Sequence, residues 1–134
     1  MEQIMYLLLD LSERDVIHTA LFDEKIINHD QVSGRNRELL FVVEQFLLKE
    51  KLKSDDVKGI MVVVGAGGFT NTRIAIVLAN TYAYTKKIPL LSITKDQVPQ
   101  VQTLIPDLLN QPIGQYIAAT YSAAPNITEP KNVL

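Results

Sequence analysis

Asp10 is the first residue in the chain whose type and position could do chemistry. It closes a nearly continuous apolar run, residues 4–10, and is followed by Leu11 and Ser12. A carboxylate at the end of a buried strand can hold a magnesium ion, or a water bound to a phosphate, at a nucleotide site. It can equally cap the following turn by accepting hydrogen bonds from backbone N–H groups. The sequence leaves both roles open.

A glycine-rich loop follows a second apolar run, residues 59–64. The loop comprises Gly65, Ala66, Gly67 and Gly68. Backbone N–H groups in such a loop can approach a phosphate closely, and the same glycines can serve a tight turn with positive φ. The loop has neither the third glycine of a dinucleotide motif nor the lysine of a P-loop. We treat Asp10, Gly65, Gly67 and Gly68 as candidate cofactor contacts on an incomplete motif.

Other residue types used in catalysis are scarce. The chain has no cysteine and two histidines, His18 and His29. Both fall in strand-like segments without a carboxylate at a telling spacing, so we expect them to face solvent. No helix carries an H-x-x-x-H pattern, and no serine stands in a G-x-S-x-G frame. The sequence therefore predicts no catalytic residue and no metal site.

The elements that must position these residues alternate in type. The predicted strands cover residues 4–10, 16–22, 25–32, 59–64, 90–93 and 113–121. The predicted helices cover residues 36–52 and 70–87, and Thr94 with Gln97 has the capping-box spacing that starts a third. Three leading strands in an antiparallel meander, followed by strand–helix crossovers, predict a mixed sheet with helices packed on it. We expect one α/β domain over residues 1–122 and a flexible tail over 123–134.

Two of the helices carry more apolar surface than one core requires. The first has apolar residues on the side opposite its core stripe, and the second has small residues four apart that let another helix approach closely. This row of small residues can pack inside the domain or join the first helix in a surface for a partner. We expect a partner surface. Its predicted interface residues are Phe41, Leu48, Leu52, Ile76, Ala79 and Ala83.

Charge and hydropathy exclude several classes of function. The chain has 13 basic and 15 acidic residues, a net charge of −2, and no cluster of Lys and Arg beyond a pair. We therefore expect no direct contact with nucleic acid from this chain alone. No apolar run approaches the roughly 20 residues that span a membrane, and the first residues lack the basic start of a secretory signal. We expect a cytoplasmic protein.

Several motifs together resemble the TsaB (YeaZ) family. Residues 65–74, GAGGFTNTRI, resemble the family signature GPGSFTGLRI. Residues 10–12 are similar to the family's DTS after the first strand, and residues 37–40 to the start of its first helix, usually HSELL. Residues 88–90 resemble the IPL strand, and residues 115–119 the GEVYAA strand. The match covers nearly the whole chain in the family's order.

The resemblance implies both a fold and a role. It implies a single lobe of the actin-like ATPase (ribonuclease H-like) fold. TsaB-type proteins are non-catalytic partners of TsaD, which carries the metal and transfers a threonylcarbamoyl group to adenosine in tRNA. Their first two helices form a bundle with TsaD or with a second copy. We therefore expect a scaffold for this t6A modification that pairs with a TsaD-like protein, with itself, or with both.

Departures from the family pattern bear on cofactors. Family members have two lobes with the nucleotide site between them, and this sequence matches the first lobe. Leu11 and Asn71 stand where the family has a threonine and a turn glycine. We expect no cofactor, with ATP and magnesium bound only if a partner completes the site. The alternative function is an ATP-binding half-enzyme that completes its nucleotide site across a dimer.

Overall fold

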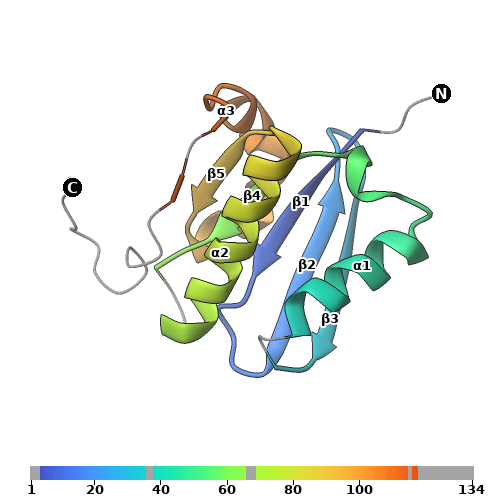
Figure 1. Cartoon of the computed structure of the whole chain (residues 1–134), viewed down its shortest axis with the longest axis vertical. Coiled ribbons are helices and arrows are strands. Elements are labelled where there is room, and N and C mark those ends of the chain that lie inside the picture. Colours follow the sequence, from blue (N-terminus) through green and yellow to red (C-terminus); the bar gives the residue numbers. More distant parts are fainter. Residues whose placement is uncertain (1–3, 36–37, 66–68, 115, 118–134) are drawn as a thin grey trace.

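A five-stranded mixed sheet forms the centre of the computed structural model, which describes residues 4–35, 38–65, 69–114 and 116–117. The strands are β1 (Met5–Asp10), β2 (Val16–Phe22), β3 (Ile27–Ser33), β4 (Val57–Val63) and β5 (Leu90–Ile93), in the order β3-β2-β1-β4-β5. The first three strands pair antiparallel, whereas β4 runs parallel to both β1 and β5 (Figure 1). The predicted mixed sheet with three leading antiparallel strands is confirmed.

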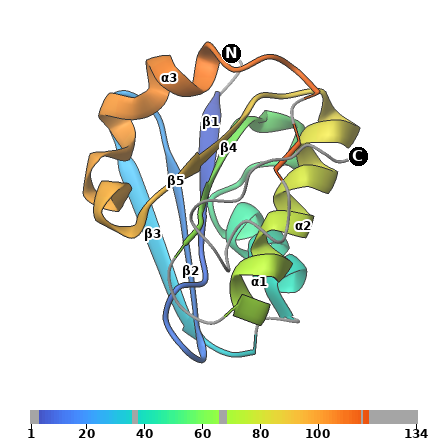
Figure 2. The ribbon, with the colours of Figure 1, turned by 90° about the vertical axis from the view of Figure 1, so that its left-hand side faces the viewer.

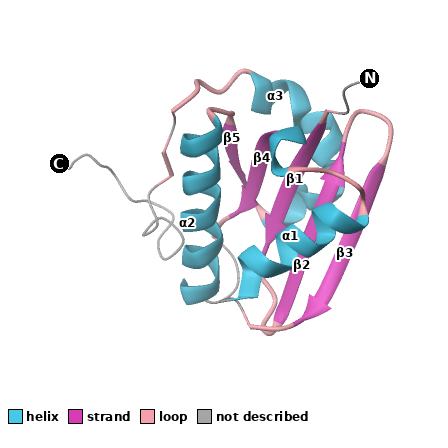
Figure 3. Ribbon diagram, turned by 45° about the vertical axis from the view of Figure 1, so that its right-hand side comes forward, coloured by secondary structure: helices cyan, strands magenta, loops and turns pink. Residues whose placement is uncertain are grey.

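Helices cover both faces of the sheet. On one face lie α1 (Leu39–Lys49) and α2 (Phe69–Lys86), and on the other lie the 3₁₀ segment η3 (Lys95–Leu104) and α3 (Ile105–Leu109). The short turn η2 (Ser54–Asp56) leads into β4. Figure 2 shows the sheet edge-on between these two layers, and Figure 3 shows α1 and α2 together on one side of it.

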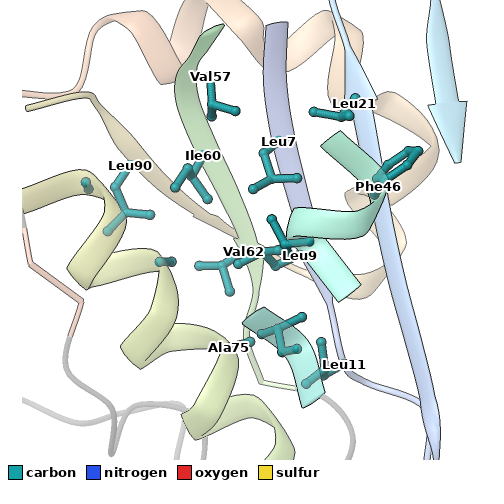
Figure 4. Close-up of a cluster of buried hydrophobic side chains, with 14 of the residues drawn as sticks. Leu7, Leu9, Leu11, Leu21, Phe46, Val57, Ile60, Val62, Ala75 and Leu90 are labelled. Carbon is teal, nitrogen blue, oxygen red and sulfur yellow. The ribbon is translucent and has the colours of Figure 1, made fainter. Parts of the chain in front are cut away.

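The central strand β1 supplies side chains to two cores. Leu7 and Leu9 pack with α1 and α2, in the cluster drawn in Figure 4. Tyr6 and Leu8 point to the other face, into the cluster under η3 and α3. A strand buried on both faces reads as a continuous apolar run, which is why the segment before Asp10 has no alternation. Asp10 continues the series of Tyr6 and Leu8 and therefore faces η3.

Several elements differ from the predictions: β3 begins at Ile27 rather than at residue 25, and α1 ends at Lys49 rather than at residue 52. β4 begins at Val57, two residues earlier than expected, because Val57 pairs with Met5 at the start of β1. The predicted third helix is the 3₁₀ segment η3, with a kink at Gln100 next to Pro99. Proline has no N–H to donate and favours a break in a regular helix. The capping box at its start is confirmed, because the Thr94 N–H donates to Oε1 of Gln97 at 2.9 Å.

The predicted last strand, residues 113–121, is not a strand where the structure describes it. Residues 113, 114, 116 and 117 have no strand pairing, and the rest of that segment and the predicted tail over 123–134 lie outside the described residues. Ile117 is instead held by α2: Asn80 Nδ2 donates to the Ile117 carbonyl at 2.7 Å, and the Ile117 N–H donates to Asn80 Oδ1 at 3.0 Å. A side-chain amide thus satisfies the backbone groups that a strand partner would bind.

Candidate functional site

Asp10 lies at the carboxyl end of β1 with hydrogen-bond donors on both carboxylate oxygens. Oδ1 accepts from the backbone N–H of Ser12 at 3.0 Å and from its hydroxyl at 2.6 Å. Oδ2 accepts from Lys95 Nζ at 2.7 Å and from His18 Nδ1 at 3.3 Å. The side chain is 1% exposed, so the carboxylate is buried but satisfied. The turn-capping alternative is confirmed by the bond from the Ser12 N–H.

The electrostatics of the cluster favour an ionised Asp10. Burial alone would raise the pKa of Asp10, but hydrogen bonds from His18, Lys95 and Ser12 outweigh it and hold the pKa well below its usual range. The distance of 2.7 Å to Lys95, against 3.3 Å to His18, makes Lys95 the principal counter-charge. Glu13 lies on the other side of Lys95, at 3.9 Å.

The prediction that both histidines face solvent is wrong for His18. The antiparallel register places His18 directly opposite Asp10, and His18 is buried. Its Nε2 lies 2.9 Å from Nδ1 of His29, which is exposed on the edge strand β3 as predicted. The hairpin turn was visible in the sequence. A register counted from that turn brings Asp10 within one residue of His18, which is the signal that the sequence reading missed.

Lys95 was also missed because it is 85 residues from Asp10 in the chain. It follows directly after β5 and Thr94, whereas Asp10 ends β1. Parallel strands of one sheet bring their carboxyl ends to the same edge, where ligand-binding and charged side chains gather. The signal available in the sequence was a charged residue just beyond the end of a predicted parallel strand.

The cluster does not fit a magnesium–nucleotide group. The space among Asp10, His18, Gln31 and Lys95 has a volume of about 10 Å³, which is room for about one water. Within the described ranges, no three His, Asp or Glu side chains gather as metal ligands would. Gly65 has the positive φ, 78°, of the turn alternative, while Gly67 and Gly68 lie outside the described residues. In this structure Asp10 caps a turn and pairs with Lys95.

The predicted interface residues divide into two groups. Phe41 and Leu48 on α1 are exposed, at 63% and 68%. The other four are buried inside the chain, which corrects their assignment to an exposed surface: Leu52, Ile76, Ala79 and Ala83. The small side chains of α2 join the core beneath that helix, so the alternative that they pack inside the domain is right.

Apolar hollows lie along the outer side of α1 and α2. One, of about 330 Å³, is lined chiefly by Leu39, Leu40, Ile74, Val77 and Leu78. A second, of about 430 Å³, also includes Leu40 and extends past Leu48 to Tyr82. Leu40 and Val77 are half exposed. We call this continuous surface the α1–α2 groove.

The architecture defines the class of protein. A mixed sheet in the order β3-β2-β1-β4-β5, with α1 and α2 on one face and η3 and α3 on the other, is a single lobe of the actin-like, ribonuclease H-like fold. None of the described helices is long and apolar enough to cross a bilayer.

Comparison with solved structures shows a more specific similarity. The chain is similar to YeaZ from Pseudomonas aeruginosa, with 25% sequence identity and a TM-score of 0.62 over 69% of this chain and 44% of that one. A structure described as an uncharacterized protein with similarity to peptidase YeaZ from Pseudomonas aeruginosa matches with the same values. No protein-family model and no curated protein matches. The chain is a TsaB/YeaZ-like protein that spans less than half the length of the solved structures it matches.

Proposed function

We propose that this chain is a non-catalytic partner subunit resembling TsaB, which acts in t6A modification of tRNA in the cytoplasm. It forms a helix-mediated dimer with a TsaD-like protein or with a second copy of itself. The partner supplies the chemistry and the contacts to tRNA. The likeness to YeaZ supports a role at the level of the family. The α1–α2 groove is the observation that carries the dimer.

The α1–α2 groove has the properties of one side of a protein–protein interface. Leu40 of α1 and Val77 of α2 each expose about half of their surface, and Leu48 extends the apolar area along α1. Removing such side chains from water stabilises a complex by roughly 25 cal/mol per Å². Single exposed apolar residues are ordinary, but a continuous apolar groove between two helices marks a docking surface.

The polar margin of the groove suits a helical partner. Glu44, Gln45 and Lys53 line its outer end beside the apolar floor. Interfaces have an apolar centre and a polar rim that stays partly hydrated. A pair of helices packed across α1 and α2 could bury the roughly 1,600 Å² of a standard interface.

Size-exclusion chromatography with light scattering tests the proposal, on this protein alone and mixed with the TsaD-like protein of the same organism. We expect a dimer or a mixed complex that Leu40→Asp and Val77→Asp abolish without unfolding the chain. Leu109→Asp is the matched control, because Leu109 is 53% exposed but lies on α3, on the opposite face of the sheet. A wild-type chain that stays monomeric in both samples would contradict the proposal. Ala79→Asp is unsuitable, since Ala79 is buried.

We further propose that the chain performs this role without its own nucleotide. The support is the Asp10 carboxylate, whose oxygens already accept four hydrogen bonds from Ser12, His18 and Lys95. Titration calorimetry with magnesium and ATP should give no heat of binding at millimolar nucleotide for this chain by itself, whether it is a monomer or a homodimer. Binding would instead favour the ATP-binding half-enzyme.

A further inference from the structure

His18 and His29 meet edge to edge. The nitrogens Nε2 of His18 and Nδ1 of His29 are 2.9 Å apart, the ring centroids are 5.1 Å apart, and the ring planes differ by 24°. The centroid distance exceeds the nitrogen–nitrogen distance by about two ring radii, so the two nitrogens lie between the rings. This is a nearly in-line hydrogen bond between imidazoles, not a face-to-face stack.

Asp10 determines which nitrogen carries each proton. Asp10 is ionised and can only accept, so Nδ1 of His18 must donate to it. In a neutral His18 ring, Nε2 then has the lone pair and accepts from the Nδ1–H of His29. The remaining nitrogen of His29, Nε2, has a lone pair and belongs to an exposed residue of the edge strand. A chain of hydrogen bonds therefore joins an exposed side chain to a buried carboxylate.

Charged groups from each neighbouring element face this series of hydrogen bonds. Asp10 comes from β1, Glu13 from the turn before β2, and Lys95 from the start of η3. His18 and His29 come from β2 and β3. With both histidines neutral, Asp10 and Lys95 balance each other, and Glu13 is the second carboxylate within reach of Lys95.

We propose that Asp10, His18 and His29 form a proton relay that delivers positive charge from the edge strand to the ion pair of Asp10 with Lys95. A solvent proton binds Nε2 of His29. The Nδ1–H bond of His29 breaks as its proton passes to Nε2 of His18. His29 ends neutral with its proton on Nε2, and His18 ends as an imidazolium ion against Asp10.

The relay weakens the attachment of η3 to β1. Once His18 is charged, Asp10 has two cations on one carboxylate, and these repel each other. Lys95 is the more exposed cation, at 43%, and moves toward Glu13 and solvent. Partial desolvation and the neighbouring His18 lower the pKa of His29, which favours onward transfer of a bound proton to His18. The start of η3 is therefore released as the pH falls.

Nuclear magnetic resonance can follow the relay directly, because these are the only two histidines in the chain. Ring signals of both histidines and the side-chain signal of Lys95 would be recorded from pH 8 down to pH 5. We expect all three to move with one shared midpoint. Independent midpoints for the two histidines, or a Lys95 signal that stays flat through their transition, would overturn the proposal.

Linkage requires a reciprocal effect. If protonation of His18 weakens the hold on Lys95, removing the Lys95 charge must strengthen proton binding by the pair. Lys95→Met should raise the shared midpoint by about one pH unit, a tenfold gain in proton affinity. Lys49→Met is the control, because Lys49 pairs with Asp30 on the opposite face of β3 and should leave the midpoint unchanged. An unchanged midpoint in Lys95→Met refutes the relay.

A second variant interrupts the relay itself. His18→Gln keeps a donor for Asp10 but cannot take up a proton near neutral pH. In that variant His29 should titrate alone and the Lys95 signal should become flat through the transition. A Lys95 signal that still follows His29 would mean that charge reaches the ion pair without His18, which contradicts the proposal. The inference does not depend on the proposed function.

Discussion

Polar side chains of the sheet differ in how well their burial is compensated. Asp10 is buried with donors on both oxygens, whereas Thr19 in β2 is fully buried and its hydroxyl finds no hydrogen-bond partner among the described residues. Thr19 faces the α1–α2 side of the sheet, between Ile17 and Leu21. A buried hydroxyl without a partner costs about 1–3 kcal/mol of stability. The Asp10 side of the sheet therefore has its buried polar atoms hydrogen-bonded. The unpaired hydroxyl that lowers stability, that of Thr19, lies on the other face of the sheet.

Replacing Thr19 with valine should stabilise the chain. Thr19→Val keeps the shape and removes the unpaired hydroxyl, so we expect the free energy of unfolding to rise by about 1 kcal/mol. Urea unfolding measures it. Thr81→Val serves as the control, because the Thr81 hydroxyl donates to the Val77 carbonyl at 2.9 Å and is exposed. A loss of stability in Thr19→Val would show that the hydroxyl is satisfied in solution.

The lowered pKa of His29 makes stability depend on pH. Partial desolvation of the ring and the charge of His18 lower the pKa of His29 in the folded chain. The unfolded chain therefore binds more protons as the pH falls through about 6.5, so stability is complete above that value and declines below it. Urea unfolding at pH 7.5 and pH 5.5 should show a loss that His29→Gln reduces. An equal loss in His29→Gln would assign the pH dependence to other groups.

Both long helices end with the same motif. After α1 the Leu52 N–H donates to the Leu47 carbonyl at 2.8 Å, and after α2 the Ile88 N–H donates to the Ala83 carbonyl at 3.1 Å. The residue just before each donor, Lys51 in the first helix end and Lys87 in the second, has a positive φ, of 60° and 57° respectively. This is the left-handed ending that glycine usually occupies. Each lysine holds a backbone conformation that costs a side chain roughly 1 kcal/mol.

Glycine at these two helix ends should stabilise the fold. Lys51→Gly and Lys87→Gly each relieve the positive φ, and we expect each to raise the free energy of unfolding by about 0.5–1 kcal/mol. Thermal or urea unfolding measures the change. Thr85→Gly, two residues before Lys87 and inside the helix, should instead lower stability. If all three variants lose stability, the left-handed endings are not present in solution.

At the scale of the whole molecule, one sheet separates two sides with different roles. The side of η3 and α3 carries the buried carboxylate of Asp10 and its partly exposed partner Lys95. The other side carries α1 and α2, whose outer groove leaves Leu40 and Val77 half exposed. The proposed docking surface and the proposed proton relay therefore lie on opposite faces of the sheet, so variants of one can be made without touching the other.

A partner in the groove must raise the melting temperature by mass action. If the chain pairs with itself, a tenfold increase in its concentration should raise Tm, because only the folded chain presents the groove. If it pairs only with a TsaD-like protein, Tm should rise on adding that protein and not with the concentration of this chain. Leu40→Asp should remove either shift while Leu109→Asp retains it. No shift in any of these samples would count against a docking role.

Local patterns determined most of the fold in advance. The apolar run before Asp10, the alternating strand and helix periods and the capping box at Thr94 each depend on neighbouring residues, so the sequence alone predicts the strand order in the chain and the mixed sheet. The order of motifs likewise pointed to the TsaB/YeaZ likeness. These signals are short-range, and the physics that produces them is periodicity and turn chemistry.

Only the tertiary structure decided which residues meet. The sequence does not say that α2 turns Ala79 inward and leaves Val77 at the groove, because an alanine row packs equally well against a sheet or another chain. The sequence also does not predict that Lys95 contacts Asp10, 85 residues away, or that His18 contacts His29. Parallel strand pairing and strand register create those contacts. Helix rotation and sheet register are set by the burial of the whole core, and they determined both the α1–α2 groove and the charged cluster.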